Sequence, residues 1–145
     1  MDGKFVEVKV KGVVKSLGLT SPDEVVPLGL TPSFLLEDDK RRVIAIKIGE
    51  KFPLVNEAIS GGLTPYNTLV SILERLKVKV NGVLIYDVEE NFYAKMYFET
   101  DSNKFEEEVE VCDAITISIL TRAPIYVDTK TMDEFSADIS ELIRR

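Results

Sequence analysis

The sequence predicts a single α+β domain. Its 145 residues are enough to bury a sizeable core, and an apolar content of 45% with 30% charged residues is typical of a soluble globular chain. Segments that alternate apolar and polar residues, as strands do, share the chain with segments whose apolar residues recur at helical spacing. Because no repeat, low-complexity segment or linker divides residues 1–145, we expect one domain.

The first third of the chain is expected to be β structure. Residues 5–14 alternate valines with charged residues, which indicates a half-buried strand. Residues 16–31 are rich in Gly, Pro, Ser and Thr and predict a long loop. The apolar runs at 34–36 and 42–48 flank an acidic turn at 37–40, so they predict a hairpin.

Two helices are predicted in the middle of the chain. The first covers residues 51–60, with Pro53 in its first turn, and ends at Gly61-Gly62. Thr64 is suited to cap the second helix, which would run from Pro65 to residue 76. Its apolar residues recur at helical spacing: Tyr66, Leu69, Ile72, Leu73 and Leu76.

Residues 77–98 favour strands in one of two arrangements. Asn81-Gly82 would suit a tight hairpin turn between two short strands. Alternatively, one long strand from residue 78 to 88 is kinked at Gly82 and pairs with residues 92–98. We favour the long strand because it gives two partners of matched length on either side of a turn at 89–91.

The segment from 108 to 127 is the longest strongly apolar stretch. Residues 105–111, which overlap its start, predict a charged strand with Glu106, Glu108 and Glu110 on one face. Three glutamates on one face are more typical of a solvated face than of a metal site. Residues 113–122 fit both strand alternation and helical spacing, and Pro124 would end any helix near residue 122.

The C-terminal end is predicted to hold a short strand and a last helix. Residues 125–127 are of β type. Residues 131–134, Thr-Met-Asp-Glu, form a capping-box pattern that would open the helix. The apolar stripe of this helix would consist of Phe135, Ile139, Leu142 and Ile143.

Several classes of function are disfavoured by composition. The chain has no His and one Cys, so a Ser-His-Asp triad, a Cys-His pair or a zinc site is not expected, although carboxylates could still hold a hard cation. The net charge of -7 disfavours binding to nucleic acid by bulk electrostatics. No apolar run is long enough to span a membrane, and a lone Cys suits a cytoplasmic location. The absence of His, Trp and Gln leans toward a thermophile composition.

Cys112 and Asp113 stand at the start of the apolar run. Cys112 is expected to be a small buried residue and not a nucleophile, because its neighbours are apolar and there is no His to activate it. Asp113 is suited either to the first turn of a helix, where a carboxylate is stabilised by the helix dipole, or to a site acid, and the first interpretation is favoured.

Three segments together resemble the bifunctional nuclease (DUF151) domain family over about residues 33–140. They are GLTPYNTLVSILERL, VLIYDVEENFYAKMYF and DAITISILTRAPIYV. The family pattern has a hairpin ending in Ile-Gly, a helix opened by Thr-His-Asp, a strand pair with an Asn-containing turn, Ser-Arg-Pro-Ser-Asp-Ala opening an apolar helix, and then Ala-Pro-Ile. The chain matches it at 48–49, 69–76, 91–93, 113–115 and 123–125.

The departures from the family pattern fall on its polar positions. Phe52 stands where the family has Glu, Tyr66-Asn67 where it has His-Asp, and Glu110 where it has Arg. Asp113 keeps the family's identity. Replacing His by Tyr removes a general base, and replacing Asp by Asn removes a charge that a metal ion would use.

The resemblance implies a fold and two alternative functions. The fold is α+β, a mixed and largely antiparallel sheet with helices packed against it, in which 113–122 is a helix and one long strand passes through Gly82. One function is a homodimeric nuclease that cleaves DNA or RNA, with Asp113, Asn67 and Tyr66 as catalytic residues and Asp113 with Glu110 as ligands of Mg²⁺ or Mn²⁺. The alternative is a non-catalytic member of the family that serves as a dimeric scaffold or binding module. A small-molecule pocket near Tyr66 and Asn67 is a third option.

Overall fold

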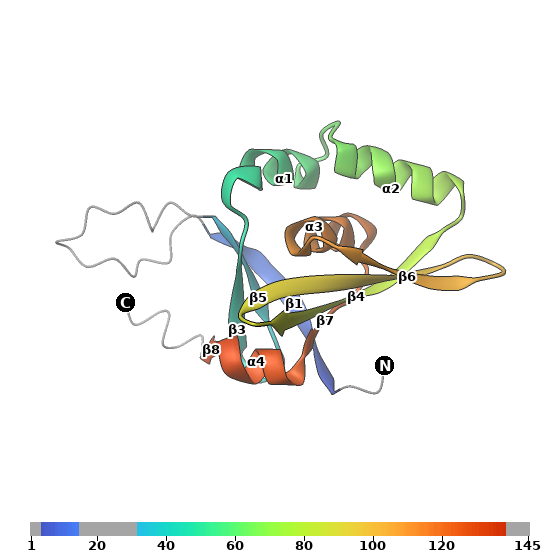
Figure 1. The fold of residues 1–145 in the computed structure, drawn as a ribbon. Helices are drawn as coiled ribbons and strands as arrows, with labels where there is room; N and C mark the ends of the chain where they lie inside the picture. The colour runs from blue at the N-terminus through green and yellow to red at the C-terminus, as the bar shows by residue number, and fades with distance from the viewer. Residues whose placement is uncertain (1–3, 15–31, 139–145) are drawn as a thin grey trace.

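The computed structural model describes residues 4–14 and 32–138, in which eight strands form one sheet and four α-helices pack with it (Figure 1). In chain order the elements are β1 (Phe5–Val14), β2 (Ser33–Glu37), β3 (Arg42–Lys47), the 3-10 turn η2 (Gly49–Lys51), α1 (Phe52–Ile59), α2 (Pro65–Arg75), β4 (Lys79–Val88), β5 (Asn91–Glu99), β6 (Lys104–Val109), α3 (Val111–Thr121), β7 (Ile125–Asp128), α4 (Thr129–Phe135) and β8 (Ala137–Asp138).

The sheet is mixed and largely antiparallel. Its strand order is β6-β5-β4-β7-β1-β2-β3-β8. Neighbouring strands are antiparallel except β4 and β7, which run parallel because α3 lies on the path between the β4–β6 meander and β7. The predicted α+β class is therefore confirmed.

The predicted N-terminal strand and hairpin are confirmed. Asp38 stabilises the β2–β3 turn, since its buried carboxylate accepts hydrogen bonds from the backbone N–H groups of Lys40 at 3.0 Å and Arg42 at 2.8 Å. Burial by itself would raise the Asp38 pKa, but the Arg42 backbone N–H and then the Arg42 guanidinium, 2.8 Å from the carboxylate, lower it. The predicted loop at 16–31 lies outside the described residues.

Helices α1 and α2 occupy the predicted positions. Thr64 and Asn67 form a reciprocal cap at the start of α2, in which the Thr64 N–H donates to Asn67 Oδ1 at 3.1 Å. Gly62 is required between the helices, because a Cβ at this position would lie 2.4 Å from Cγ of Glu57. Of the helices that the structure describes, none is long and apolar enough to cross a membrane.

Strand β4 runs unbroken through Asn81 and Gly82, as favoured from the sequence. A register shift between Val80 and Gly82 marks the kink, so the glycine makes a bulge and not a hairpin turn. The ring of Tyr126 on the neighbouring strand β7 lies against Gly82, where a Cβ would be 3.3 Å from its Cε2.

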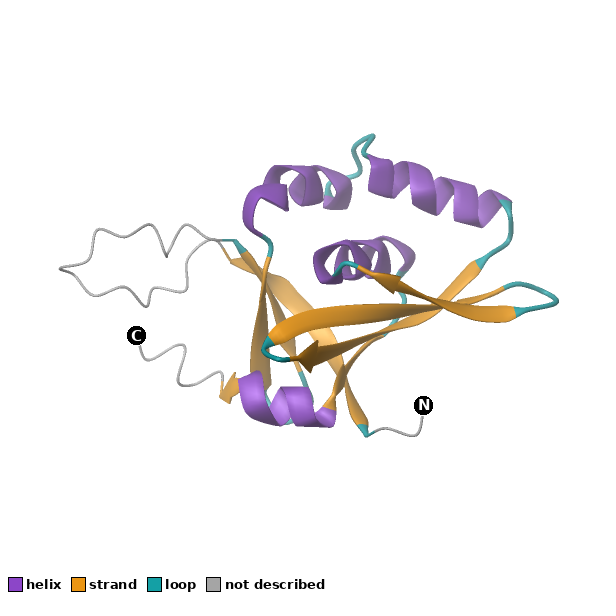
Figure 2. Ribbon diagram, viewed as in Figure 1, coloured by secondary structure: helices purple, strands orange, loops and turns teal. Residues whose placement is uncertain are grey.

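Helix α3 occupies the centre of the domain. It lies between the strands and the pair α1–α2 (Figure 2), and it contacts α1, α2, β4 and β5. Ala114, Ile115 and Thr116 are each 0% exposed. Packing on several sides therefore outweighs the preference of its β-branched residues for strands. Arg122, at φ 59°, ends the helix before Pro124.

The predicted start of the last helix is wrong. Helix α4 begins at Thr129, capped by Asp128, whose carboxylate accepts from the Thr131 N–H at 3.3 Å. Thr131 is instead an interior residue whose hydroxyl donates to Asp87 at 2.7 Å. The helix ends at Phe135, and Ser136 is extended before β8. The other three residues of the predicted apolar stripe, Ile139, Leu142 and Ile143, lie outside the described residues.

Candidate functional site

Four polar side chains meet at the N-terminal end of α3. Glu110 directly precedes the helix, and Asp113 lies in its first turn. Lys51 ends the 3-10 turn before α1, and Tyr66 lies in the first turn of α2. The cluster is therefore assembled from three segments that are distant in sequence, because α1 and α2 both pack on α3.

The ammonium group of Lys51 lies between the two carboxylates. Its Nζ donates to Glu110 Oε1 at 2.8 Å and to Asp113 Oδ1 at 3.0 Å. The Tyr66 hydroxyl donates to the same Asp113 oxygen at 2.5 Å. Tyr66 is 8% exposed, whereas the side chains of Lys51 and Glu110 keep 43% and 46% of their surface. The cluster carries one positive and two negative groups, so its formal charge is -1.

Glu110 caps α3 and is not part of the predicted strand. We expected residues 105–111 to be a strand with Glu106, Glu108 and Glu110 on one face, but β6 ends at Val109. Glu110 accepts instead from the backbone N–H groups of Cys112 at 2.9 Å and Asp113 at 3.2 Å. These bonds satisfy donors that the first turn of a helix leaves free, which explains why the strand stops there.

The electrostatics of the cluster fix its protonation near neutral pH. The hydrogen bond to Glu110 raises the pKa of Lys51, although burial opposes this. Burial alone would raise the pKa of Glu110, but Lys51 and the Cys112 N–H together lower it. Burial, and then the Asp113 carboxylate, raise the pKa of Tyr66. Tyr66 therefore acts as a hydrogen-bond donor here and is poorly suited to be a general base.

Asn67, predicted as a catalytic residue, lies outside this cluster. Its Oδ1 accepts from the Thr64 hydroxyl at 2.6 Å, and its Nδ2 donates to the carbonyl of Ala58 at 3.1 Å. These contacts connect the end of α1 to the start of α2. The amide is thus engaged in holding the junction that places Tyr66 beside Asp113.

Cys112 is a buried thiol, as expected. It is 3% exposed, and its Sγ donates to the carbonyl of Lys47 at 2.9 Å. Burial raises its pKa to about 12, so the reactive thiolate is suppressed at neutral pH. The residue joins α3 to the end of β3.

The expected divalent cation would compete with Lys51 for the two carboxylates of this cluster. Glu110 and Asp113 would supply two carboxylates, and Mg²⁺ is usually held by one or two carboxylates with water completing its six ligands. Within residues 4–14 and 32–138, no group of three or more His, Cys, Asp or Glu side chains is arranged to hold a metal ion. Lys51 already places a positive charge between the two carboxylates. A metal ion would have to displace Lys51 before it could bind both carboxylates.

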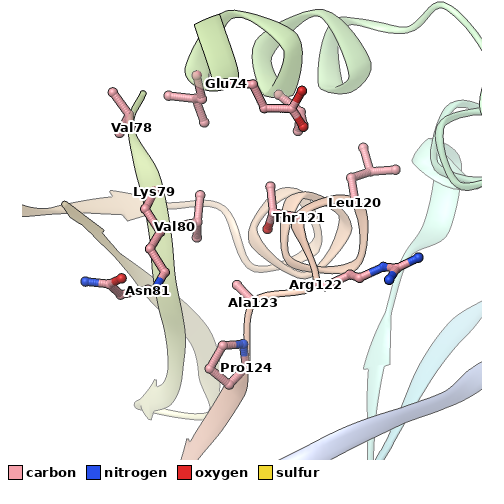
Figure 3. A pocket seen from close by; sticks show the side chains of 12 residues that line it. Glu74, Val78, Lys79, Val80, Asn81, Leu120, Thr121, Arg122, Ala123 and Pro124 are labelled. Carbon is pink, nitrogen blue, oxygen red and sulfur yellow. The ribbon is translucent and has the colours of Figure 1, made fainter. Parts of the chain in front are cut away.

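A separate hollow of about 770 Å³ lies between α2, β4 and the loop after α3 (Figure 3). Its walls include Val70, Leu73 and Val80, with Glu74 above it on α2 and Thr121 at the end of α3. None of the site residues predicted from the sequence lines this hollow. It therefore gives no support to a small-molecule pocket at Tyr66.

Lys51 is the site residue that sequence reasoning missed. A lysine in a predicted first helical turn gives no signal by itself. The resemblance did not point to it either, since it aligned the family's acid with Phe52, the residue after Lys51.

The fold and the cluster together define an α+β domain with a polar site at the start of a buried helix. The chain belongs to the bifunctional nuclease domain family, whose model matches residues 34–140. The resemblance inferred over residues 33–140 is confirmed. No curated protein matched the chain.

We expect Lys51→Met to lower the free energy of unfolding by about 1 kcal/mol at neutral pH, a value limited by solvent screening of these half-exposed groups. Because the pKa of Glu110 is depressed, its carboxylate stabilises the fold above pH 4.5, the ordinary pKa of the group. This stabilisation is lost as the pH falls through the folded pKa. Because the pKa of Lys51 is raised, its ammonium group stabilises the fold below pH 10.5, the ordinary pKa of the group. This stabilisation is lost as the pH rises through the folded pKa. The free energy of unfolding of Lys51→Met should therefore differ most from that of wild type between pH 4.5 and pH 10.5.

Urea denaturation at acidic and neutral pH measures this difference. Lys47→Met is the matched control, because Lys47 is exposed at the end of β3 and its removal changes the net charge equally. A Lys51→Met effect that is the same at both pH values, or one equalled by Lys47→Met, would contradict the role given to the cluster.

Proposed function

We propose that this domain is a non-hydrolytic member of the bifunctional nuclease family that serves as a protein-binding scaffold. The observation that carries the proposal is the position of Lys51, whose ammonium group bridges Glu110 and Asp113. The cluster is held by charges internal to the chain, so it stabilises the packing of α1 and α2 on α3. A cytoplasmic location, supported by the single free Cys, belongs to the same proposal.

Electrostatics support the absence of phosphodiester hydrolysis. A nucleic-acid phosphate would approach a cluster of formal charge -1 on a chain of net charge -7. Catalysis of phosphoryl transfer depends on positive groups or metal ions that stabilise charge on the phosphate. The one cation of the cluster, Lys51, is already neutralised, and Tyr66 is held protonated by burial and by Asp113.

Metal-dependent cleavage of DNA or RNA is the second candidate. Family membership supports it, together with the approach of two carboxylates, Glu110 and Asp113, at the start of one helix. It requires Lys51 to leave both carboxylates before Mg²⁺ or Mn²⁺ could bind them. The two functions therefore differ in what removal of Lys51 should do.

The test is a cleavage assay on fluorescent single- and double-stranded DNA and RNA with Mg²⁺ or Mn²⁺. We expect no cleavage above background from wild-type protein, because Lys51 competes with the metal ion for both carboxylates. Metal-dependent cleavage by wild type that Asp113→Asn abolishes and Lys47→Met leaves intact would establish the nuclease instead. Lys51→Met separates the two further, since a gain of cleavage in this variant alone would show that the lysine blocks the site.

We also propose that the scaffold is a homodimer formed through α2. A stripe of apolar residues on this helix is exposed, with Leu69 at 41%, Ile72 at 47% and Leu76 at 67%. Leu63, just before the helix, is 99% exposed. Contiguous exposed apolar residues are a common mark of an interface, and a two-fold axis would bring the same stripe from each copy together.

We expect Ile72→Glu to convert a dimer to a monomer in size-exclusion chromatography with light scattering, since a buried unpaired carboxylate at a two-fold contact occurs twice. Ser71→Glu is the control, because Ser71 is exposed on the same helix and points away from the stripe. A monomeric wild type, or an equal effect of both variants, would refute dimerisation through α2.

A further inference from the structure

Four of the five tyrosines lie on one face of the sheet. Tyr86 is on β4, Tyr93 and Tyr97 are on β5, and Tyr126 is on β7. Only Tyr66 is elsewhere, in the polar cluster at α3. Such a concentration of one residue type is not explained by the core, to which these strands contribute the residues of their other face, such as Val83 and Ile85.

The strand register places the tyrosines together. Tyr86 pairs with Tyr93 across β4 and β5, and Gly82 pairs with Tyr97. Side chains alternate between the two faces of a strand. The intervening residues Val83, Ile85, Ala94 and Met96 are at most 1% exposed. The tyrosines therefore lie on the opposite side from the buried core.

Two of the four rings are in contact with each other, and all four side chains remain partly exposed. Tyr86 and Tyr93 are stacked, with ring centroids 5.9 Å apart and planes at 25°. Tyr93 keeps 43% of its surface exposed. Tyr126 packs edge-on against Phe5, and the absence of a side chain at Gly82 leaves room for its ring. This face of the sheet therefore offers a ligand one exposed ring, that of Tyr93, beside three half-buried ones.

Carboxylates border these rings along β6, the edge strand of the sheet. The Tyr86 hydroxyl donates to Glu108 at 3.4 Å. Burial and then Glu106 raise the pKa of Tyr97. Lys95 of β5 lies on the same face, in register with Glu108, and Glu106 lies in register with Tyr97. Together, Tyr86, Tyr93, Tyr97, Tyr126, Glu106 and Glu108 form what we term the tyrosine face.

We propose that the tyrosine face binds an Arg- or Lys-rich segment of a partner protein. A guanidinium or ammonium group is attracted to the open face of an aromatic ring and, more strongly, to a neighbouring carboxylate. The tyrosine face supplies both within one patch. Tyrosine is also enriched where proteins bind one another, since it offers a large contact area with few rotatable bonds.

The negative charge of the tyrosine face favours a basic peptide over two other partners, a second copy of the chain and a nucleic acid. A second copy of the chain would bring Glu106 and Glu108 toward the same carboxylates on an identical face, at a net charge of -7 per chain. Nucleic-acid bases could stack on the tyrosines, but their phosphates would meet the carboxylates of β6. A basic peptide is the partner whose charge complements the face. The binding needs no metal ion, so it stands or falls separately from the chemistry at Lys51.

Intrinsic tyrosine fluorescence provides the assay, because the chain has no Trp and four of its five tyrosines lie on the tyrosine face. The probe is a short peptide of alternating Arg and Gly, titrated at low salt without metal ions. We expect a saturable change in fluorescence, with affinity reduced about threefold by Glu106→Gln and by Glu108→Gln. Tyr93→Leu, which keeps an apolar side chain but removes an exposed ring, should also weaken binding.

Glu107→Gln is the matched control, since Glu107 lies between the two test residues on β6 and points to the other face. It should leave the affinity unchanged. Equal losses for Glu107→Gln and Glu108→Gln would overturn the proposal by showing only long-range attraction. A failure of the peptide to bind, or tighter binding of oligothymidylate than of the peptide, would overturn it as well.

Discussion

The burial of α3 is the constraint on which the rest of this structure depends. The helix has strands on one side and α1 with α2 on the other, so almost every side chain of its first eight residues is enclosed. A buried helix must satisfy its polar atoms inside the protein. Thr116 does so by donating to the carbonyl of Cys112 at 2.7 Å, and Ser118 by donating to the carbonyl of Ala123 at 2.6 Å.

The same constraint shapes the polar cluster. The first turn of α3 leaves backbone N–H groups free, and Glu110 accepts from two of them. This places one carboxylate beside another, Asp113, at the partly exposed end of the helix. Two neighbouring carboxylates repel each other unless a cation lies between them. Lys51 supplies that cation from within the chain, and in doing so it ties α1 to α3.

Much of the fold could be predicted from local patterns in the sequence. The capping residues Thr64 and Pro65, the alternation in β1 and the turn after β2 are local signals, and the structure confirms them. The start of α4 was placed too late because Thr131 resembles a cap, whereas its contact with Asp87 on β4 is a tertiary one. In the same way, nothing local to Glu110 shows that β6 must end before it.

The site was only partly predictable for a related reason. Tyr66, Glu110 and Asp113 were chosen by their positions in a family pattern, and the fold brings these three together. Asn67 follows Tyr66 in sequence, but its amide turns back to cap α2. Lys51 could be recognised only once α1 was docked on α3. The clustering of four tyrosines on one face could likewise be recognised only from the strand register.

The central claim is that Lys51 takes the position that a metal ion would occupy between Glu110 and Asp113. Anomalous diffraction from crystals soaked in Mn²⁺ tests it most directly. The expected result is a Lys51 ammonium group bridging both carboxylates with no anomalous peak beside them. An anomalous peak within coordination distance of Glu110 and Asp113, with Lys51 displaced, would contradict the claim.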